Sequence, residues 1–165
     1  MFFRIKKIKG KEYAYIVENE WKRTGSRQKV KGYAGRSYKF DLISNVGFFE
    51  YHKIWDIQNY VNVNEKNKII SDLIEWEFFK FGVDKKEFLI DLINAKIQKN
   101  KKNVVLLVND GFMCNLTLKK LFDFKPEGDE QIDGYRLARA FVEAGIKIPE
   151  EIFVGIFGKI YKSPE

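Results

Sequence analysis

The residues with the clearest potential for chemistry are three cations at alternate positions, Arg27, Lys29 and Lys31. Alternation is the side-chain period of a β-strand, so the three side chains are predicted to share one face of a sheet. On that face they lie ~7 Å apart, close to the roughly 6–7 Å between successive phosphates of a nucleic-acid backbone. The spacing therefore predicts a strand that binds phosphates.

Neighbouring residues extend this row of cations. Lys22 and Arg23 precede it across a polar loop, and Tyr33 ends it with a ring that can stack on a base. Arg4 and Lys6 share one face of an earlier strand. The predicted nucleic-acid-binding residues are Arg4, Lys6, Lys22, Arg23, Arg27, Lys29, Lys31, Tyr33 and Arg36. The competing interpretation is a solvated sheet face whose lysines guard an exposed edge against aggregation.

The positive charge of the chain is concentrated in its first quarter. Residues 1–39 hold twelve lysines and arginines but three acids, whereas the other 126 residues hold 18 basic and 20 acidic side chains. The whole chain of 165 residues carries a net charge of +7, and a general lysine bias would spread that charge evenly. The skew therefore predicts a polyanionic partner, nucleic acid, for the N-terminal segment.

The chain contains few residues that could form a catalytic or metal-binding site. The single histidine, His52, lies among aromatic residues, and the single cysteine, Cys114, follows a predicted turn, so both are interpreted as structural. No glycine–lysine–serine or glycine–lysine–threonine triplet of a phosphate-binding loop occurs. Asp110 and the acids from Glu127 to Asp133 fit a turn and a helix start. We therefore predict no catalytic residue, no metal and no cofactor.

The elements that must position the cations are predicted to form a three-stranded antiparallel meander. Residues 2–9, 12–21 and 27–34 each alternate or extend as strands do, and short polar turns connect them. Gly35 is expected to end the third strand. Residues 37–43 are compatible with a further strand.

The middle of the chain predicts helices. Apolar spacing over residues 65–81 predicts one helix, and a capping box that begins at Asp84 predicts a second helix over 84–98. Residues 44–63 are rich in aromatic side chains but lack a period, so an irregular or strand-like connection is expected there. Lys99–Lys102 follows as a basic, polar break.

A smaller hairpin is predicted next. Val104–Val108 has the β-branched, apolar composition of a buried strand, and Asn109–Gly111 is a strong turn signal. Residues 112–118 are favoured as the returning strand. The alternative is a helix that Asn115 caps and that runs to Phe122.

Two helices are predicted at the C-terminal end, after a loop at residues 125–129. The first spans 132–144 and the second begins near Glu150. The side chains expected to face inward from the first are Tyr135, Ala138, Phe141 and Val142. An apolar seam of Phe141, Val142, Phe153 and Phe157 is expected to be mostly buried or, if exposed, to form a homodimer or protein-partner surface.

The expected fold class is α+β: an N-terminal three-stranded antiparallel meander, then helices around a smaller β-hairpin, then two C-terminal helices. We expect a basic meander over residues 1–43 and a mixed region over 44–165, together forming one continuous compact domain. The helix pair followed by a hairpin is compatible with a winged-helix-like unit. No 18-residue apolar run occurs, so we expect no membrane partner and a cytoplasmic location.

A further pattern runs over about residues 9–36. Its residues are Tyr13, Tyr15, Val17-Glu18-Asn19, Gly25, Arg27-Gln28-Lys29-Val30 and Tyr33-Ala34-Gly35. On these residues the segment resembles the N-terminal segment of IS1634-type transposases and of related small archaeal proteins of unknown function. The resemblance implies a DNA-facing sheet but no transposition, because the acidic triad of a transposase does not occur at matching distances. The rest of the chain shows no such resemblance.

These observations predict a small nucleic-acid-binding protein that prefers DNA and uses a basic sheet face on phosphates. The alternative is an RNA- or ribosome-associated module whose C-terminal helices meet a protein. A metal-dependent nuclease is the weakest of the three hypotheses, since its carboxylates already have structural explanations.

Overall fold

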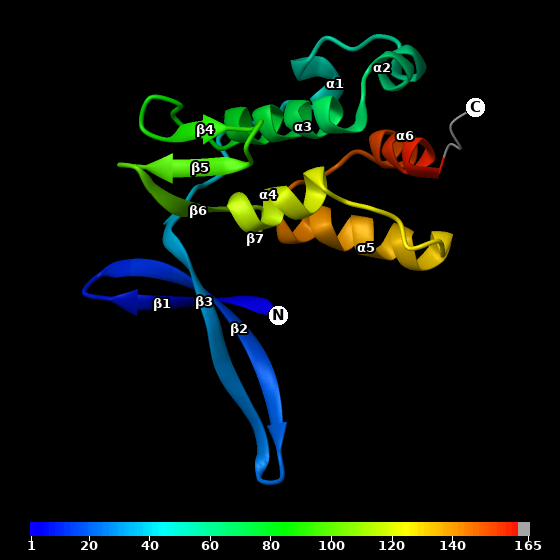
Figure 1. Cartoon of the computed structure of the whole chain (residues 1–165). Helices are drawn as coiled ribbons and strands as arrows, with labels where there is room; N and C mark the ends of the chain where they lie inside the picture. The colour runs from blue at the N-terminus through cyan, green and yellow to red at the C-terminus, as the bar shows by residue number, and fades with distance from the viewer. Residues whose placement is uncertain (162–165) are drawn as a thin grey trace.

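Seven strands and six helices form the residues that the computed structural model describes, 1–161 (Figure 1). The strands make one mixed sheet in the order β1-β2-β3-β6-β5-β4, and β7 also pairs with β6. The helices gather near the part of the sheet that β4–β7 build, whereas the β2–β3 hairpin projects away from them. The α+β class is therefore confirmed.

The N-terminal meander is present as predicted. It consists of β1 (Phe2–Ile8), β2 (Lys11–Lys22) and β3 (Gly25–Lys39), paired antiparallel. Every residue from Trp21 to Lys31 is exposed, so the far end of the β2–β3 hairpin is a two-stranded ribbon surrounded by solvent.

Gly35 does not end the third strand, in contrast to the sequence prediction. The strand continues to Lys39 and pairs in parallel with β6 (Lys102–Val108), with Arg36 opposite Val104. Gly35 has φ +135°, and a Cβ there would lie 2.3 Å from the carbonyl oxygen of Asn103. Glycine therefore permits both the backbone conformation and the close approach of the two strands.

Residues 44–63 form two short helices rather than an irregular or strand-like connection. They are α1 (Phe48–Tyr51) and α2 (Ile57–Val63), and they precede the predicted long helix α3 (Lys66–Lys80). Phe48 is buried between rings from α1, α2 and α3, and Asp56 caps α2 by accepting a hydrogen bond from the Asn59 amide. Helices this short leave too few turns for a period to show in the sequence.

The predicted helix over 84–98 is wrong. Asp84 does accept the Lys86 amide, but only one turn forms, and the chain continues as β4 (Leu89–Asp91) and β5 (Lys96–Lys99). Asp91 accepts hydrogen bonds from both the backbone and the side-chain amide of Asn94. This turn chemistry overrides the helical spacing, as is typical of Asx turns.

Residues 111–122 combine the strand and the helix that the sequence offers as alternatives. The returning strand β7 (Gly111–Met113) is only three residues long, and α4 (Asn115–Phe122) follows it at once. The cap of α4 is Cys114 rather than Asn115, and the Thr117 hydroxyl accepts the Cys114 amide at 3.1 Å. The predicted hairpin is therefore present but short.

The two C-terminal helices are α5 (Glu130–Glu143) and α6 (Glu150–Tyr161). Phe141 is fully buried, but Tyr135 and Val142 are 69% and 68% exposed, so their predicted inward orientation is wrong. The buried stripe of α5 instead runs through Leu137, Ala140 and Phe141. Ala138, Phe153 and Phe157 are half-buried.

The core has two parts. The larger one lies between α3, α4, α5, α6 and the strands β5–β7, and the smaller one contains Ala14, Ala34, Val105 and Cys114. The smaller cluster joins the meander to β6, so the meander is packed against the rest of the chain at its base. None of the helices in residues 1–161 is long and apolar enough to cross a membrane.

Candidate nucleic-acid interface

The two sides of the meander carry different chemistry, and the uninterrupted alternation of β2 defines them. One side, here called the tyrosine face, carries Tyr13, Tyr15 and the residues paired with them. The other, the charged face, carries Glu18, Glu20 and their partners. The tyrosine face consists of Arg4, Lys6, Tyr13, Tyr15, Trp21, Tyr33 and Arg36; the charged face consists of Glu12, Glu18, Glu20, Lys22, Arg27, Lys29 and Lys31.

One register shift in β3 moves Tyr33 away from the cations with which it was predicted to share a face, and a second shift, after Tyr33, places Arg36 on the same side as Tyr33. Val30 pairs with Val17 and Gly32 with Ile16, which leaves Lys31 as an extra residue, and a second shift leaves Ala34 extra. Each extra residue inverts the alternation of the residues after it. Tyr33 therefore lies beside Tyr13 and Tyr15, on the side opposite Lys29.

The charged face holds the predicted row of cations, but acids from β2 are interleaved with it. Lys31 lies 3.2 Å from Glu18, and Lys29 lies 3.6 Å from Glu20. Lys22 also approaches Glu20, at 3.9 Å. Exposed pairs of this kind contribute about 0–1 kcal/mol to stability, but they reduce the net positive field that a phosphate meets.

The end of the ribbon keeps its charge. Within residues 1–161, neither Arg23 nor Arg27 forms an ion pair, and both are exposed near the turn that joins β2 to β3. Trp21, on the other side of the ribbon from Arg27, is 81% exposed. The predicted residues Arg23 and Arg27 are thus available to an anionic partner.

The tyrosine face is built around Tyr33. Its ring centroid lies 5.3 Å from that of Tyr15 and 6.3 Å from that of Tyr13, and Lys6 lies 4.8 Å above the Tyr15 ring. Arg4 donates a hydrogen bond of 2.8 Å to Gln28. Partial burial, together with the neighbouring phenols, raises the pKa of Tyr33, so its hydroxyl stays neutral in the physiological range.

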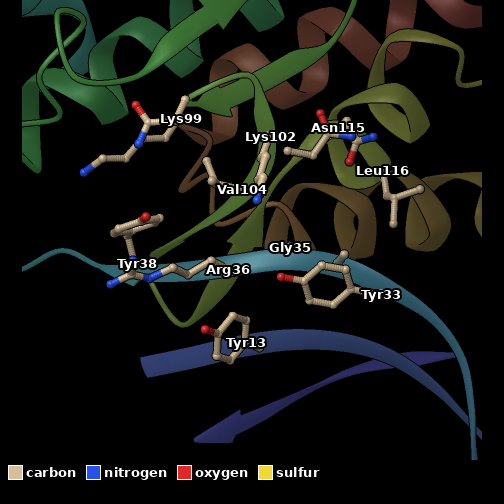
Figure 2. A pocket seen from close by; sticks show the side chains of 13 residues that line it. Tyr13, Tyr33, Gly35, Arg36, Tyr38, Lys99, Lys102, Val104, Asn115 and Leu116 are labelled. Carbon is tan, nitrogen blue, oxygen red and sulfur yellow. The ribbon is translucent and has the colours of Figure 1, made fainter. Parts of the chain in front are cut away.

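A groove of about 590 Å³ adjoins Tyr33 (Figure 2). Arg36 and Tyr38 line it from β3, and the turn between β5 and β6 faces them with Lys99 and Lys102. Among residues 1–161, no acidic side chain lines this groove. The full lining is Tyr13, Tyr33, Ala34, Gly35, Arg36, Tyr38, Lys99, Asn100, Lys102, Asn103, Val104, Asn115 and Leu116.

The cations of this groove differ in their partners. The Arg36 guanidinium and the Lys99 ammonium each lie 4.9 Å from the centre of the Tyr38 ring. Lys99 also forms an ion pair with Glu87, at the edge of the groove. Arg36 and Lys102 have no ion-pair partner in the part of the chain that the structure describes, so their charges are available.

Sequence reasoning found Tyr33 and Arg36 but missed Tyr38, Lys99 and Lys102. The Lys99–Lys102 segment was recognised only as a basic break, because nothing local indicates that it faces β3. Asn100 and Lys101 adopt φ of 51° and 63°, as a tight hairpin turn requires. The turn itself could have been recognised beside the buried strand, but its position opposite β3 could not.

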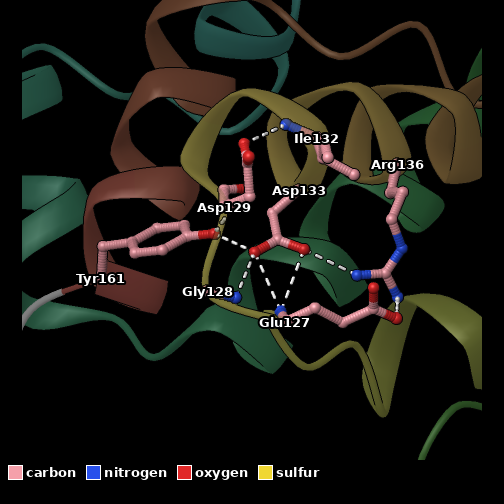
Figure 3. A network of polar contacts seen from close by, with 7 residues as sticks. All are labelled: Glu127, Gly128, Asp129, Ile132, Asp133, Arg136 and Tyr161. Atoms are coloured by element: carbon pink, nitrogen blue, oxygen red, sulfur yellow. Dashed lines mark hydrogen bonds and ion pairs between the residues drawn. The ribbon is translucent and has the colours of Figure 1, made fainter.

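The acids near the start of α5 have a structural role (Figure 3). Asp133 is fully buried and accepts hydrogen bonds from the Glu127 and Gly128 amides, from Arg136 and from Tyr161. Burial alone would raise the pKa of Asp133, but these donors outweigh it and lower the pKa to about 2. The network fastens α6 and the loop before α5 to each other.

The other reactive side chains are also engaged. His52 donates to the Asp72 carbonyl oxygen at 2.8 Å, and burial raises the pKa of the Cys114 thiol. Among residues 1–161 no three or more His, Cys, Asp or Glu side chains are grouped so that they could hold a metal ion.

The chain was also compared with models of protein families, with curated proteins and with solved structures, and none of them matches it. A proposal for the function must therefore be argued from the geometry of the two faces and the groove.

Proposed function

We propose that this protein binds nucleic acid through its N-terminal sheet. The observation that carries the proposal is the groove, which no acid of residues 1–161 lines. It contains the exposed ring of Tyr33 and two cations, Arg36 and Lys102, that have no ion-pair partner among these residues. Cations without acidic partners attract a polyanion, and an exposed ring offers a surface for a base. Both kinds of contact occur within one hollow of the sheet.

The ribbon supplies a second contact region in this proposal. A two-stranded ribbon is an element that the major groove of DNA can admit, and Arg23 and Arg27 stand near its end. The preference for DNA comes from the resemblance of residues 9–36 to transposase segments. An RNA partner is the alternative, and both kinds of probe belong in the test.

A metal-dependent nuclease is not proposed. Its carboxylates would have to come from Asp110 or from the acids around Asp133. Asp110 occupies a turn with φ 59°, and Asp133 is saturated by its own hydrogen bonds.

Binding of labelled oligonucleotides by fluorescence anisotropy tests the proposal. The probes are a duplex DNA, single strands of DNA and RNA, and a structured RNA, each at two salt concentrations. We expect micromolar or tighter binding at low salt. A plot of log affinity against log salt concentration should fall with a slope of about 0.9 per phosphate contact for duplex DNA, or about 0.7 per contact for single strands. Absence of binding to all probes at low salt would overturn the proposal.

A further inference from the structure

We infer that the tyrosine face binds a single strand of nucleic acid, with a base stacked on Tyr33 and phosphates on Arg36 and Lys102. This inference rests on the proposed function and adds the class of ligand. DNA and RNA strands share the chemistry that it requires, a planar base and a flexible anionic backbone.

The sorting of charge between the two faces is the first support. Residues 1–39 contain three acids, Glu12, Glu18 and Glu20, and all three belong to the charged face. The tyrosine face of the meander therefore has cations and aromatic rings but no carboxylate. A row of aromatic side chains within a positive surface is the usual construction of a single-strand binding site.

The exposure of Tyr33 is the second support. Its side chain is 57% exposed although two other tyrosines pack beside it, so Tyr13 and Tyr15 hold the ring in place and leave a surface open. A ring already fixed by its neighbours loses little conformational entropy when a base stacks on it. Its raised pKa keeps the phenol uncharged, and a neutral ring does not repel the phosphates.

The position of the cations is the third support. Arg36 lies on the same side of β3 as Tyr33, and Lys102 faces both from the opposite wall of the groove (Figure 2). Arginine can bind a phosphate through two parallel hydrogen bonds, and lysine acts as a point charge. A strand that lies in the groove thus has access to one base platform, Tyr33, and to two cations that can bind phosphates.

The same geometry disfavours a duplex at this site. In a duplex the faces of the bases are covered by their stacked neighbours, so only the backbone would reach the groove and Tyr33 would contribute little. A single strand can turn one base out onto the ring without breaking a base pair. The dependence of binding on Tyr33 therefore distinguishes the two ligands.

The experiment measures the affinity of oligo(dT) and oligo(U) 15-mers, and of a duplex, for the wild-type protein and for Tyr33→Leu and Tyr33→Trp. For the single strands, Tyr33→Leu is expected to weaken binding by about 5- to 150-fold, the equivalent of ~1–3 kcal/mol for one stacked base. Tyr33→Trp should restore it, and duplex binding should change less than threefold. Circular dichroism and melting temperature confirm that each variant is folded.

An oligonucleotide without bases provides the matched control, because it keeps the phosphates and removes the stacking partner. It should bind the wild type more weakly than oligo(dT) does, and Tyr33→Leu should not weaken it further. If duplex and single strand bind equally and Tyr33→Leu changes neither, the inference is wrong while the proposed function stands. If no probe binds the wild type, both fail. The ratio of oligo(dT) to oligo(U) affinity assigns the strand as DNA or RNA, and a loss on Tyr33→Leu with either one supports the inference.

Discussion

The two faces of the N-terminal sheet are built by the same three strands, but the cations on the two faces have different neighbours. On the charged face, Glu18 and Glu20 lie between the lysines and form ion pairs with them. On the tyrosine face, the cations lie beside aromatic rings and leave their charges available. Cation density along a sequence is thus a poor guide to an anion site, because the strand opposite decides which charges are neutralised.

The largest expected effect comes from adding one methyl group where β3 approaches the backbone of β6. Gly35→Ala should lower the free energy of unfolding by about 1–3 kcal/mol from backbone strain and by a further ~1–3 kcal/mol from overpacking, because the new Cβ would lie 2.3 Å from the Asn103 oxygen. Urea denaturation measures the loss.

Gly25→Ala is the matched control for Gly35→Ala. Gly25 also has a positive φ, +123°, but a Cβ there meets nothing within 4 Å. Gly25→Ala should therefore lower the free energy of unfolding only by the cost of backbone strain. Equal losses for the two variants would mean that β3 does not press against Asn103.

Removing two cations either from the groove or from the charged face tests the comparison directly. Arg36→Ala/Lys102→Ala and Lys29→Ala/Lys31→Ala lower the net charge equally. For single strands, the first double variant should make the slope of log affinity against log salt concentration shallower by about 1.4, because two contacts at ~0.7 each are lost. The second double variant should change this slope by less than half a unit. Equal reductions would show that only total charge matters and that the two faces are equivalent.

The opposite change on the charged face should have a smaller effect. Glu18→Gln/Glu20→Gln frees Lys29 and Lys31 from their partners while leaving the groove untouched. We expect single-strand affinity to rise less than threefold, with the slope nearly constant, because the freed lysines lie on the far side of the sheet. A slope steeper by more than one unit would identify the charged face as the binding surface.

The smallest effect is expected from alkaline pH. Since the pKa of Tyr33 is raised above its ordinary value of 10.0, the phenol stays neutral between pH 7 and 9.5, and no negative charge develops in the groove. Affinity for oligo(dT) should therefore change less than twofold over this range when salt is held constant. A marked loss between pH 8 and 9.5 that Tyr33→Phe abolishes would show that the phenol ionises early.

Local patterns predicted the meander, α3, β6 and the two C-terminal helices, because each has a period and clear end signals. They failed over 84–98, where Leu89 and Ile93 fit a helical stripe but are 62% and 96% exposed in a hairpin. Hydrogen bonds from Asn94 to Asp91 stabilise a turn in that segment, and the spacing of apolar residues gives no sign of these hydrogen bonds.

The candidate site was predicted in part for a related reason. Tyr33 and Arg36 were identified, but the extra residues Lys31 and Ala34 cannot be recognised in a single strand, since a bulge is defined only against its partner. Lys99 and Lys102 come from a distant segment, and their approach to β3 depends on a long-range pairing that no local pattern encodes.

The parallel pairing of β3 with β6 also has a consequence for the order of folding. The β1–β2 and β2–β3 hairpins involve contacts between neighbours in the chain, whereas Arg36 meets Val104 only after all the residues between them have been gathered in. Closing so long a loop carries an entropic cost before its contacts form, which slows the step. We therefore expect the tyrosines to come together early and the groove wall that carries Lys102 to join them late. A newly made chain would then present Tyr33 before the groove beside it is complete.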